Sequence, residues 1–284
     1  MRCIFLKFNT YKTGVIADNV PCFDLRQTLD CGQSFRWSEN PDGSFCGVAY
    51  GKQVTVSFRD SSFVIDGASP EDFENIWKNY FDLETDYEQI RNEIRGIHPV
   101  LDEASRYCSG IRILRQEPFE ALCSFIISQN NNIGRIKGII DRMCTSFGEP
   151  AQGGGYKFVT AEKLAGMSVD DLSVLRAGFR ARYLIDAAQK VVNGEVDLEK
   201  CRTADYDDAR RELMKIIGVG TKVADCTLLF GMHRIEAFPI DVWMKRAMEK
   251  LFPTMTAKDF GKYAGIAQQY IFHYSRMNPD LFKD

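Results

Sequence analysis

The stretch Met214–Phe230, MKIIGVGTKVADCTLLF, places a Gly-Val-Gly turn between two runs with helical periodicity. This pattern predicts a helix-hairpin-helix over about residues 210–230. Gly218 and Gly220 remove side-chain bulk and permit positive φ. The backbone N–H groups around Val219, with the N-terminus of the next helix, can then approach a phosphate closely. Taken alone, the pattern is equally compatible with a plain connection between two helices.

Lys222 lies in the first turn of the second predicted helix. The field at a helix N-terminus, and any burial, disfavour the ammonium form of a lysine placed there. A nucleophilic lysine needs such an environment. Cys226 and Phe230 follow four and eight residues later and share the helix face of Lys222. A lysine that extends into solvent is the commoner alternative.

Asp241 comes nineteen residues after Lys222, directly after Pro239 and Ile240 and before an amphipathic run. This position predicts a helix N-cap. A carboxylate there also suits a group that stabilises developing positive charge. Asp241 is therefore a candidate for catalysis as well as for a structural cap.

The length and composition describe an ordinary globular protein. Its 284 residues are enough for two domains, and no apolar run reaches the roughly 18 residues that a membrane span needs. The first ten residues, MRCIFLKFNT, are too polar for the core of a signal peptide, so we expect an intracellular protein. Nine cysteines without a CxxC pair favour reduced thiols, and the three separated histidines argue against a structural metal.

The chain reads as strands first and helices afterwards. A helix start at Ser69-Pro70 follows the strands, and nearly every segment beyond residue 100 is helical. The loop EPAQGGGY, residues 149–156, has the composition of the most flexible connection. We predict an α+β fold, with an antiparallel sheet domain and packing helices at 1–107 and a mainly α-helical domain at 108–284. The predicted strands are residues 3–10, 34–37, 44–50, 52–58 and 62–67.

The charge distribution gives weak support for a polyanionic partner. The whole chain has a formal net charge of −3, which argues against a general basic surface. Residues 1–107 contain 11 Lys/Arg and 17 Asp/Glu, whereas residues 108–284 contain 25 and 22. The positive excess therefore lies on the helical half.

Several unusual stretches resemble one family when taken together. The hairpin IIGVGTKVADC (216–226), followed by FPIDVWM (238–244), is similar to the helix-hairpin-helix, Gly/Pro-rich loop and aspartate signature of the DNA glycosylase superfamily. The similarity is closest to the 8-oxoguanine DNA glycosylases. Further matches occur in the family's order over nearly the whole chain, in CGQSFRW (31–37), SFIISQNNNIGRI (124–136), GFRARY (178–183) and AQQYIF (267–272).

The resemblance implies a bifunctional DNA glycosylase/AP lyase that excises 8-oxoguanine from duplex DNA. Lys222 would attack the sugar C1′, and Asp241 would stabilise oxocarbenium character. The resulting Schiff base would permit β-elimination and strand cleavage. No redox or organic cofactor is implied, and the expected partner is damaged double-stranded DNA bound by a monomer.

The resemblance also implies how the flipped base is recognised. The Gly32 carbonyl would accept the N7–H that only the oxidised purine carries, whereas unmodified guanine presents a lone pair there. Gln268 would read the Watson–Crick edge. Phe272, one turn later on the same helix, would stack on the base opposite Cys226.

Four residues are implied to act on the opposite strand and the vacated stack. Asn130, Arg135 and Arg180 would engage the unpaired cytosine. Phe179 would wedge into the stack, where the family usually has tyrosine, so discrimination for cytosine is expected to be looser. Trp243 replaces a histidine common in the animal members that contacts phosphate, which leaves this contact in question.

The hairpin is implied to hold the DNA backbone. Gly218, Val219 and Gly220 would approach the phosphates, and the carbonyls around Ile216 and Val219 could hold an alkali or alkaline-earth ion. Three alternatives stay open: a glycosylase for another damaged base such as an alkylated purine, a non-catalytic helix-hairpin-helix module, and a structural protein without a DNA role. Lys222 argues against the first alternative. The second leaves the Lys222–Asp241 pair without a purpose, and the third leaves the glycine hairpin unexplained.

Overall fold

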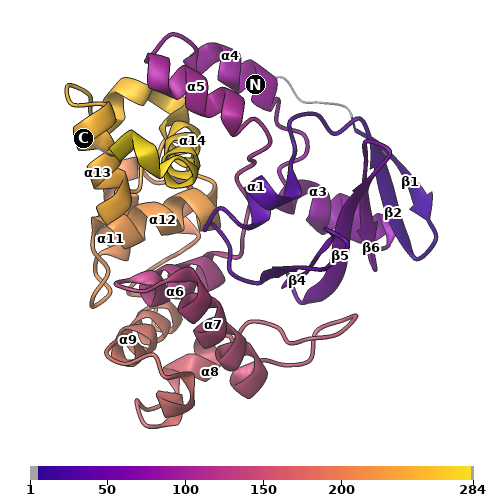
Figure 1. Cartoon of the computed structure of the whole chain (residues 1–284). Helices are drawn as coiled ribbons and strands as arrows, with labels where there is room; N and C mark the ends of the chain where they lie inside the picture. The colour runs from indigo at the N-terminus through magenta and orange to yellow at the C-terminus, as the bar shows by residue number, and fades with distance from the viewer. Residues whose placement is uncertain (1–5, 283–284) are drawn as a thin grey trace.

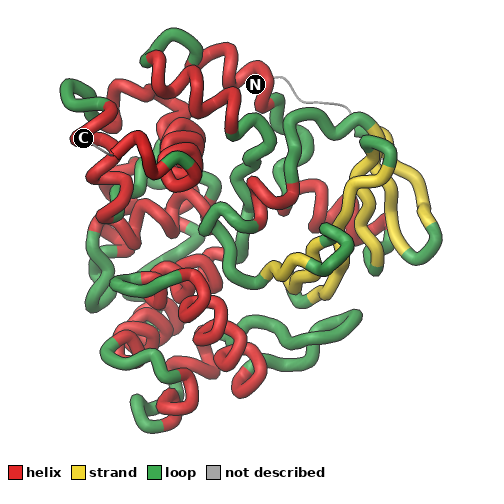
Figure 2. Tube along the Cα trace, in the orientation of Figure 1, coloured by secondary structure: helices red, strands yellow, loops and turns green. Residues whose placement is uncertain are grey.

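The computed structural model describes residues 6–282 and has an antiparallel sheet on one side with helices forming the rest (Figure 1). Figure 2 shows the strands confined to that side. This confirms the predicted α+β class. Neighbouring strands pair antiparallel in the order β1-β2-β6-β5-β4-β3. Their bounds are β1 (Lys7–Tyr11), β2 (Gly14–Asp18), β3 (Trp37–Glu39), β4 (Phe45–Ala49), β5 (Lys52–Arg59) and β6 (Ser62–Asp66).

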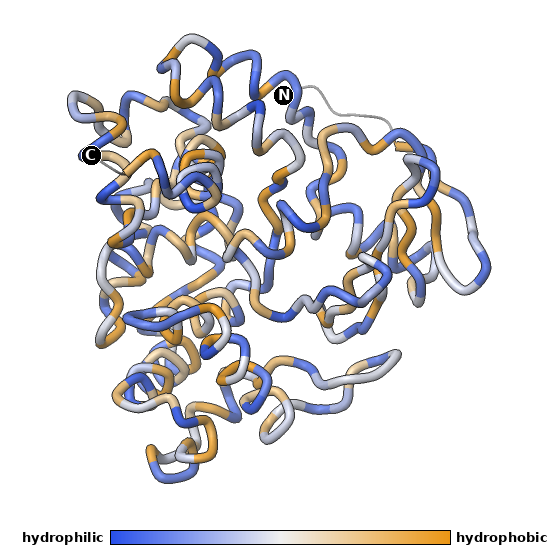
Figure 3. The backbone as a smooth tube through the Cα atoms, in the orientation of Figure 1, coloured by the Kyte–Doolittle hydropathy of each residue, from blue (hydrophilic) through white to orange (hydrophobic). Residues whose placement is uncertain are grey.

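Three predicted strands correspond to β4, β5 and β6, and the other two need correction. Residues 3–5 of the first predicted strand lie outside the described residues, and β1 begins at Lys7. The prediction at 34–37 is wrong except for Trp37, because residues 34–36 form irregular backbone and β3 begins at Trp37. Strand β2 was not predicted. Hydrophobic and hydrophilic positions interleave along the sheet (Figure 3), as expected for strands with one buried face.

A helical segment covers the buried face of the sheet. It runs through α2 (Pro70–Asp72), η1 (Phe73–Trp77) and α3 (Lys78–Tyr80). Ser69 begins it with a capping box to Asp72, as the Ser-Pro start predicts. Phe73 and Trp77 are fully buried against the sheet residues, so this segment and the sheet share one core.

The remaining helices form a second, larger core. Helices α6 and α12 pack against each other near its centre, and α14 lies beside α5. The helical bounds are α1 (Leu25–Leu29), α4 (Tyr87–Ile94), α5 (Pro99–Tyr107), α6 (Pro118–Ser128), α7 (Ile133–Phe147), α8 (Ala161–Ala165), η2 (Asp171–Leu175), α9 (Arg180–Val192), α10 (Lys200–Thr203), α11 (Tyr206–Leu213), α12 (Thr221–Met232), α13 (Val242–Leu251), η3 (Ala257–Tyr263), α14 (Ala264–Met277) and η4 (Pro279–Phe282).

Helices α4 and α5 do not pack on the sheet, although the sequence grouped residues 1–107 together. Ile90, Leu101 and Ala104 are buried in the core that also contains Ile266 and Tyr270 of α14. Figure 1 shows α4 and α5 beside α14 at the top of the molecule. The helical core therefore contains elements from before residue 107, and the domain boundary at that residue stays a prediction.

The glycine-rich loop at 149–156 is paired with the sheet rather than free. It leaves α7 and extends toward β5 (Figure 1). The backbone N–H of Gln152 donates to the Gly51 carbonyl at 2.9 Å, and the Gln53 N–H donates to the Gln152 carbonyl at 2.8 Å. Gly153 and Gly154 have positive φ, which lets the loop turn tightly at this contact. The expectation of flexibility overlooked this pairing.

Among residues 6–282, no helix is both long enough and apolar enough to cross a membrane. The eight cysteines in this part of the chain are free. Cys3 lies outside the described residues.

Candidate active site

The predicted helix-hairpin-helix is present and joins α11 to α12. Gly218 has φ +79°, and a Cβ at this position would lie 2.4 Å from the ring of Tyr183, so the turn needs glycine here for two reasons. Gly220 has extended backbone and open space around it, so it does not use the positive φ that glycine permits. Gly220 is the N-cap of α12 and gives that helix no side-chain cap. The first N–H groups of α12 are thereby available to a phosphate.

Lys222 lies in the first turn of α12, as predicted, and is half-buried. Its Nζ donates a hydrogen bond to Ser128 Oγ at 2.8 Å. It also lies 5.3 Å from the centre of the Phe125 ring. Both partners belong to the last turns of α6, so the lysine is directed across the α6–α12 contact and not into open solvent.

The hydrogen-bonding of Ser128 fixes its role toward Lys222. Ser128 Oγ donates its single proton to the Phe125 carbonyl at 2.8 Å. The oxygen therefore faces Lys222 as an acceptor. Ser128 lies inside a stretch that matches the family, but the sequence indicates no role for it, because only the α6–α12 packing brings it to the lysine.

Lys222 and Asp241 both lie close enough to Cys226 to act on its thiol. Burial raises the pKa of the Cys226 thiol to about 12, although the charge and hydrogen bond of Lys222 lower it. The charge of Asp241 also acts on this thiol and raises its pKa. The thiol is therefore neutral near pH 7. The amine, the thiol and the carboxylate predicted to act together are brought together by the structure.

Asp241 is the N-cap of α13, as predicted. Its Oδ1 accepts the backbone N–H of Met244 at 2.7 Å. On each side of this half-buried aspartate stands an apolar residue that faces solvent: Ile240 is 44% exposed and Val242 is 89% exposed. Apolar side chains held outward beside a carboxylate are unusual for a free surface and suit a face that a partner covers.

Three of the predicted base-recognition residues, Gly32, Gln268 and Phe272, lie on α14 and the loop beside it, and the fourth, Cys226, lies on α12. Gly32 has φ +89°, and a Cβ built there would lie 3.8 Å from the Phe272 ring. Arg276 lies over the same ring, with its guanidinium 5.4 Å from the ring centre. Gln268 is buried, and its Oε1 accepts a hydrogen bond from Gln269 Nε2 at 2.9 Å. The structure thus brings Gly32 and Phe272 together, and it adds Gln269 and Arg276, which the sequence did not single out.

The four residues predicted for the opposite strand differ in exposure. Asn130, Arg135 and Phe179 are exposed, and Asn130 has a positive φ of 46°. Arg180 is buried, and its guanidinium donates to the carbonyls of Gln129 and Asn130 while lying 4.4 Å from the centre of the Phe179 ring. In the free protein Arg180 therefore holds the Asn130 turn in place. Its contact with a cytosine stays a prediction.

Two further predicted positions belong to the surroundings of the pocket. Trp243 directs its Nε1–H to Ser275 Oγ at 2.8 Å, so the indole is tied to α14. The Ile216 carbonyl accepts the Val219 N–H at 3.0 Å within the hairpin. A carbonyl oxygen has two lone pairs, so one remains for a cation.

Two family models together match most of the chain. Residues 15–122 match the N-terminal domain of 8-oxoguanine DNA glycosylase. Residues 123–264 match the HhH-GPD superfamily of base excision DNA repair proteins. The second match contains the hairpin, Lys222 and Asp241.

Similar proteins of known name or structure agree with these models. An N-glycosylase/DNA lyase of Saccharomyces cerevisiae is 32% identical over 85% of this chain and 71% of its own length. The 8-oxoguanine glycosylase/lyase of Clostridium acetobutylicum, in complex with double-stranded DNA containing cytosine opposite 8-oxoguanine, is 39% identical. The match covers 98% of this chain and 100% of that one, with a TM-score of 0.90. A structure described as MBOgg1 with a low-affinity DNA ligand is 42% identical, with a TM-score of 0.92 over 97% and 100% of the two chains. The chain belongs to the 8-oxoguanine DNA glycosylase family of the helix-hairpin-helix base-excision repair superfamily.

Proposed function

We propose that this protein is a bifunctional DNA glycosylase/AP lyase that removes 8-oxoguanine from duplex DNA and cuts the strand. One observation carries the assignment of its chemistry. The Lys222 amine is held by Ser128 at 2.8 Å, beside Cys226 and Asp241 and at the uncapped start of the hairpin's second helix. A positioned amine next to a carboxylate and a phosphate-binding turn suits nucleophilic attack on a sugar carbon of DNA.

The reaction begins with the damaged nucleotide turned out of the helix, at a cost of about a few kcal/mol. The bond from C1′ to the base breaks, its electrons go to the base nitrogen, and the base takes up a proton and leaves. The Asp241 carboxylate stabilises the positive charge that develops on the sugar as this bond breaks. The lone pair of Lys222 Nζ forms a bond to C1′, and the attached amine gives up a proton.

The lyase step follows from the covalent intermediate. The amine on C1′ opens the sugar ring and forms a protonated Schiff base, which withdraws electrons from C2′. Loss of a C2′ proton then expels the phosphate on the 3′ side by β-elimination. Water hydrolyses the Schiff base afterwards and returns the free lysine.

Selection of the base rests on Gly32 and α14. Under this proposal the Gly32 carbonyl accepts the N7–H of 8-oxoguanine. Among the residues that the structure describes, none donates a hydrogen bond to this carbonyl, so it is open to a ligand. Gln268 reads the Watson–Crick edge, and the base stacks between Phe272 and Cys226.

The opposite strand and the backbone are held by the exposed face around the pocket. Asn130, Arg135 and Arg180 contact the cytosine, and Phe179, which is 47% exposed, fills the vacated stack. Residues 218–220 approach the phosphates. The Ile216 and Val219 carbonyls would hold an alkali or alkaline-earth ion, which would supply positive charge for a DNA phosphate.

We further propose that the partner is damaged double-stranded DNA, bound by a monomer inside the cell without an organic cofactor. The free cysteines of the described residues fit a reducing compartment.

Release of the free base and strand cleavage test this function directly. The substrate is a duplex with 8-oxoguanine opposite cytosine, and the matched duplexes carry guanine or an alkylated purine. We expect base release from the first alone, with loss of both release and cleavage in Lys222→Gln. Faster release of the alkylated purine would favour the alternative glycosylase. Duplex binding without any release would identify a non-catalytic binding module.

A further inference from the structure

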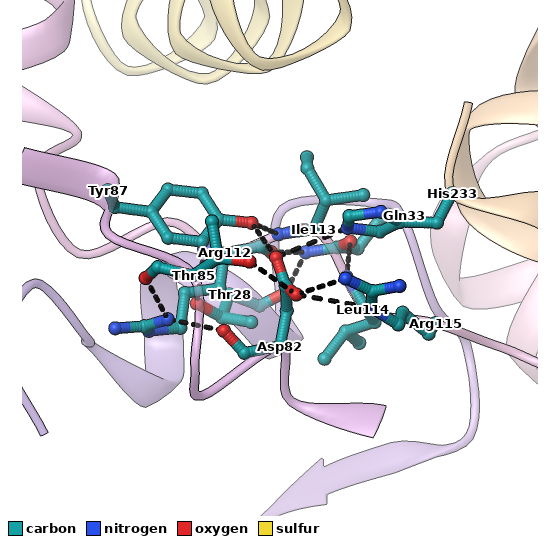
Figure 4. A network of polar contacts seen from close by, with 10 residues as sticks. All are labelled: Thr28, Gln33, Asp82, Thr85, Tyr87, Arg112, Ile113, Leu114, Arg115 and His233. Carbon is teal, nitrogen blue, oxygen red and sulfur yellow. Dashed lines mark hydrogen bonds and ion pairs between the residues drawn. The ribbon is translucent and has the colours of Figure 1, made fainter. Parts of the chain in front are cut away.

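The loop that carries Gly32 is fixed by the side chain of the next residue. Gln33 is fully buried. Its Nε2 donates to the carbonyls of Thr28 at 2.9 Å and Arg112 at 2.7 Å. Its Oε1 accepts the backbone N–H of Leu114 at 2.9 Å. Figure 4 shows the Gln33 side chain among these partners. The side-chain amide of Gln33 therefore hydrogen-bonds to backbone groups through both its nitrogen and its oxygen, and these bonds fix its position.

A second buried glutamine connects this loop to the helix that carries Lys222. Gln116 Nε2 donates to the Gln33 carbonyl at 2.7 Å. The backbone N–H of the same residue donates to the Phe230 carbonyl at 3.0 Å. Phe230 lies on α12, about two turns after Lys222. Gln116 therefore bridges the base-recognition loop and the nucleophile's helix.

Both glutamines act through one segment, residues 111–116, which we name the junction strap. The strap is anchored on its other side as well. The Ile113 N–H donates to Tyr87 Oη at 2.8 Å, and the Arg115 N–H donates to the Tyr80 carbonyl at 2.9 Å. Such a hydrogen-bonded segment between two cores behaves as a rigid spacer between the features attached to its ends.

The recognition proposed for Gly32 needs such a spacer. A single carbonyl discriminates N7–H from a lone pair only when it lies at hydrogen-bond distance while C1′ lies within reach of Lys222. The Gly32 loop has no regular secondary structure. The φ of +89° at Gly32 is an angle that only glycine adopts without strain. Its backbone would otherwise be free to shift, and a displacement of about 1 Å is enough to cost on the order of 10² in rate.

We propose that Gln33 and Gln116 are positioning residues that set the Gly32 carbonyl at a fixed distance from the Lys222 amine. This inference rests on the proposed function of the site. The inference predicts that loss of either glutamine affects base excision and not strand cleavage, whereas a simple folding defect would impair both steps. Base excision uses both Gly32 and Lys222, whereas strand cleavage at an abasic site that already exists uses Lys222 without a base to recognise.

The test compares these two steps in single-turnover assays with the full chain. One duplex carries 8-oxoguanine opposite cytosine, and the other carries a preformed abasic site. In Gln33→Met and Gln116→Met we expect base release to slow by at least about tenfold. Strand cleavage at the abasic site should stay within about twofold of the wild-type rate. Gln116→Met keeps the backbone N–H that contacts Phe230, so it decides the test if Gln33→Met does not fold.

A control from the neighbouring polar cluster distinguishes positioning from stability. His233 follows α12 with a positive φ of 53° and contacts Asp82 at 3.2 Å. His233→Asn suits this backbone and removes the contact. It should lower the melting temperature while leaving the ratio of the two rates unchanged. Equal slowing of both steps in the glutamine variants, or no change in either, would overturn the inference. Failure of the wild-type protein to release 8-oxoguanine would instead refute the proposed function.

Discussion

Two clusters of polar side chains contain a buried or half-buried aspartate, and they use it in opposite ways. The junction cluster, at the contact between the two cores, surrounds Asp82 with donors (Figure 4). Arg115 and Thr85 donate to its Oδ1, and Tyr87 donates to its Oδ2, where His233 also lies at 3.2 Å. The reaction pocket, formed by Ser128, Lys222, Cys226 and Asp241, leaves its aspartate with far fewer partners.

Asp241 uses one carboxylate oxygen to cap its own helix. Its Oδ1 caps α13 through the Met244 N–H, and for its Oδ2 the described part of the chain offers no donor. Lys222 similarly has a neutral acceptor, Ser128, in place of a carboxylate partner. A carboxylate whose bonding capacity is saturated stabilises the fold, whereas an unsaturated one remains available to a transition state.

The largest effect is expected from Asp241→Asn. Asparagine also caps helices, so α13 and the fold should be retained. Loss of the charge removes stabilisation of the oxocarbenium character and should slow base release by roughly 10²–10³-fold. Duplex affinity should stay near the wild-type value. Single-turnover release and a binding titration measure the two quantities, and unchanged base release in this variant would identify Asp241 as a structural cap alone.

Asp82→Asn should have the converse effect. Asparagine tolerates the positive φ of 51° at this position. Removing one partner of a buried charge pair costs about 3 kcal/mol of unfolding free energy. Denaturant unfolding should report that loss, while the rate of abasic-site cleavage by the remaining folded protein stays unchanged. An unchanged midpoint would show that the junction cluster contributes nothing to stability.

The same residue predicts how stability depends on pH. Burial alone would raise the pKa of Asp82, but His233 and Arg115 outweigh burial and hold that pKa well below the usual 3.8. The folded state thus binds the proton more weakly than the unfolded state does, so the contribution is present above pH 3.8 and is lost as the pH falls below it. The difference in unfolding free energy between wild type and Asp82→Asn should be constant above pH 3.8 and shrink as the pH falls further below it, and a difference that stays constant there would contradict this assignment.

Ser128→Ala should have a moderate effect confined to the reaction pocket. Without the acceptor at 2.8 Å, the Lys222 amine gains freedom above the Phe125 ring. We expect base release and abasic-site cleavage both to slow by about tenfold, because both need the positioned amine. Ser128→Thr should restore most of the rate, since it returns the hydroxyl. If the pH profile of Schiff-base formation changes in Ser128→Ala and returns to that of wild type in Ser128→Thr, the hydroxyl positions the amine. An unchanged profile in Ser128→Ala would show that Ser128 only fills space.

The smallest effect is expected from Phe179→Tyr. Phe179 is exposed and supports the Arg180 side chain through its ring. Adding the hydroxyl should sharpen the preference for cytosine opposite the lesion by a few-fold, roughly the value of one hydrogen bond. Cleavage rates with each of the four opposite bases measure this. An identical pattern in both proteins would show that position 179 does not govern the preference.

Much of the fold and the site could be predicted from the chain alone. Periodicity located α6, α7, α12 and α14, and the turn chemistry located the hairpin, because these signals are local. The resemblance located Lys222, Asp241 and Gly32. In the structure Lys222 and Asp241 both lie close enough to Cys226 to act on its thiol.

The remainder depends on contacts between distant segments. Strand β2 was missed because its local pattern is weak and tertiary pairing decides it. Ser128 and Gln116 read as ordinary helix and loop residues until α6 and the junction strap bring them to α12. The glycine loop at 149–156 looked free because its partner, Gln53, is about a hundred residues away.

The identity of the amine that attacks the sugar tests the central claim most directly. Borohydride reduction during reaction with 8-oxoguanine duplex traps the Schiff base as a stable adduct. A modified lysine resists trypsin, so attack by Lys222 predicts one adduct on the peptide spanning residues 216–234, uncut after residue 222. Mass spectrometry should find the sugar remnant there and nowhere in Lys222→Gln. An adduct on another amine, or undiminished trapping in Lys222→Gln, would contradict the account.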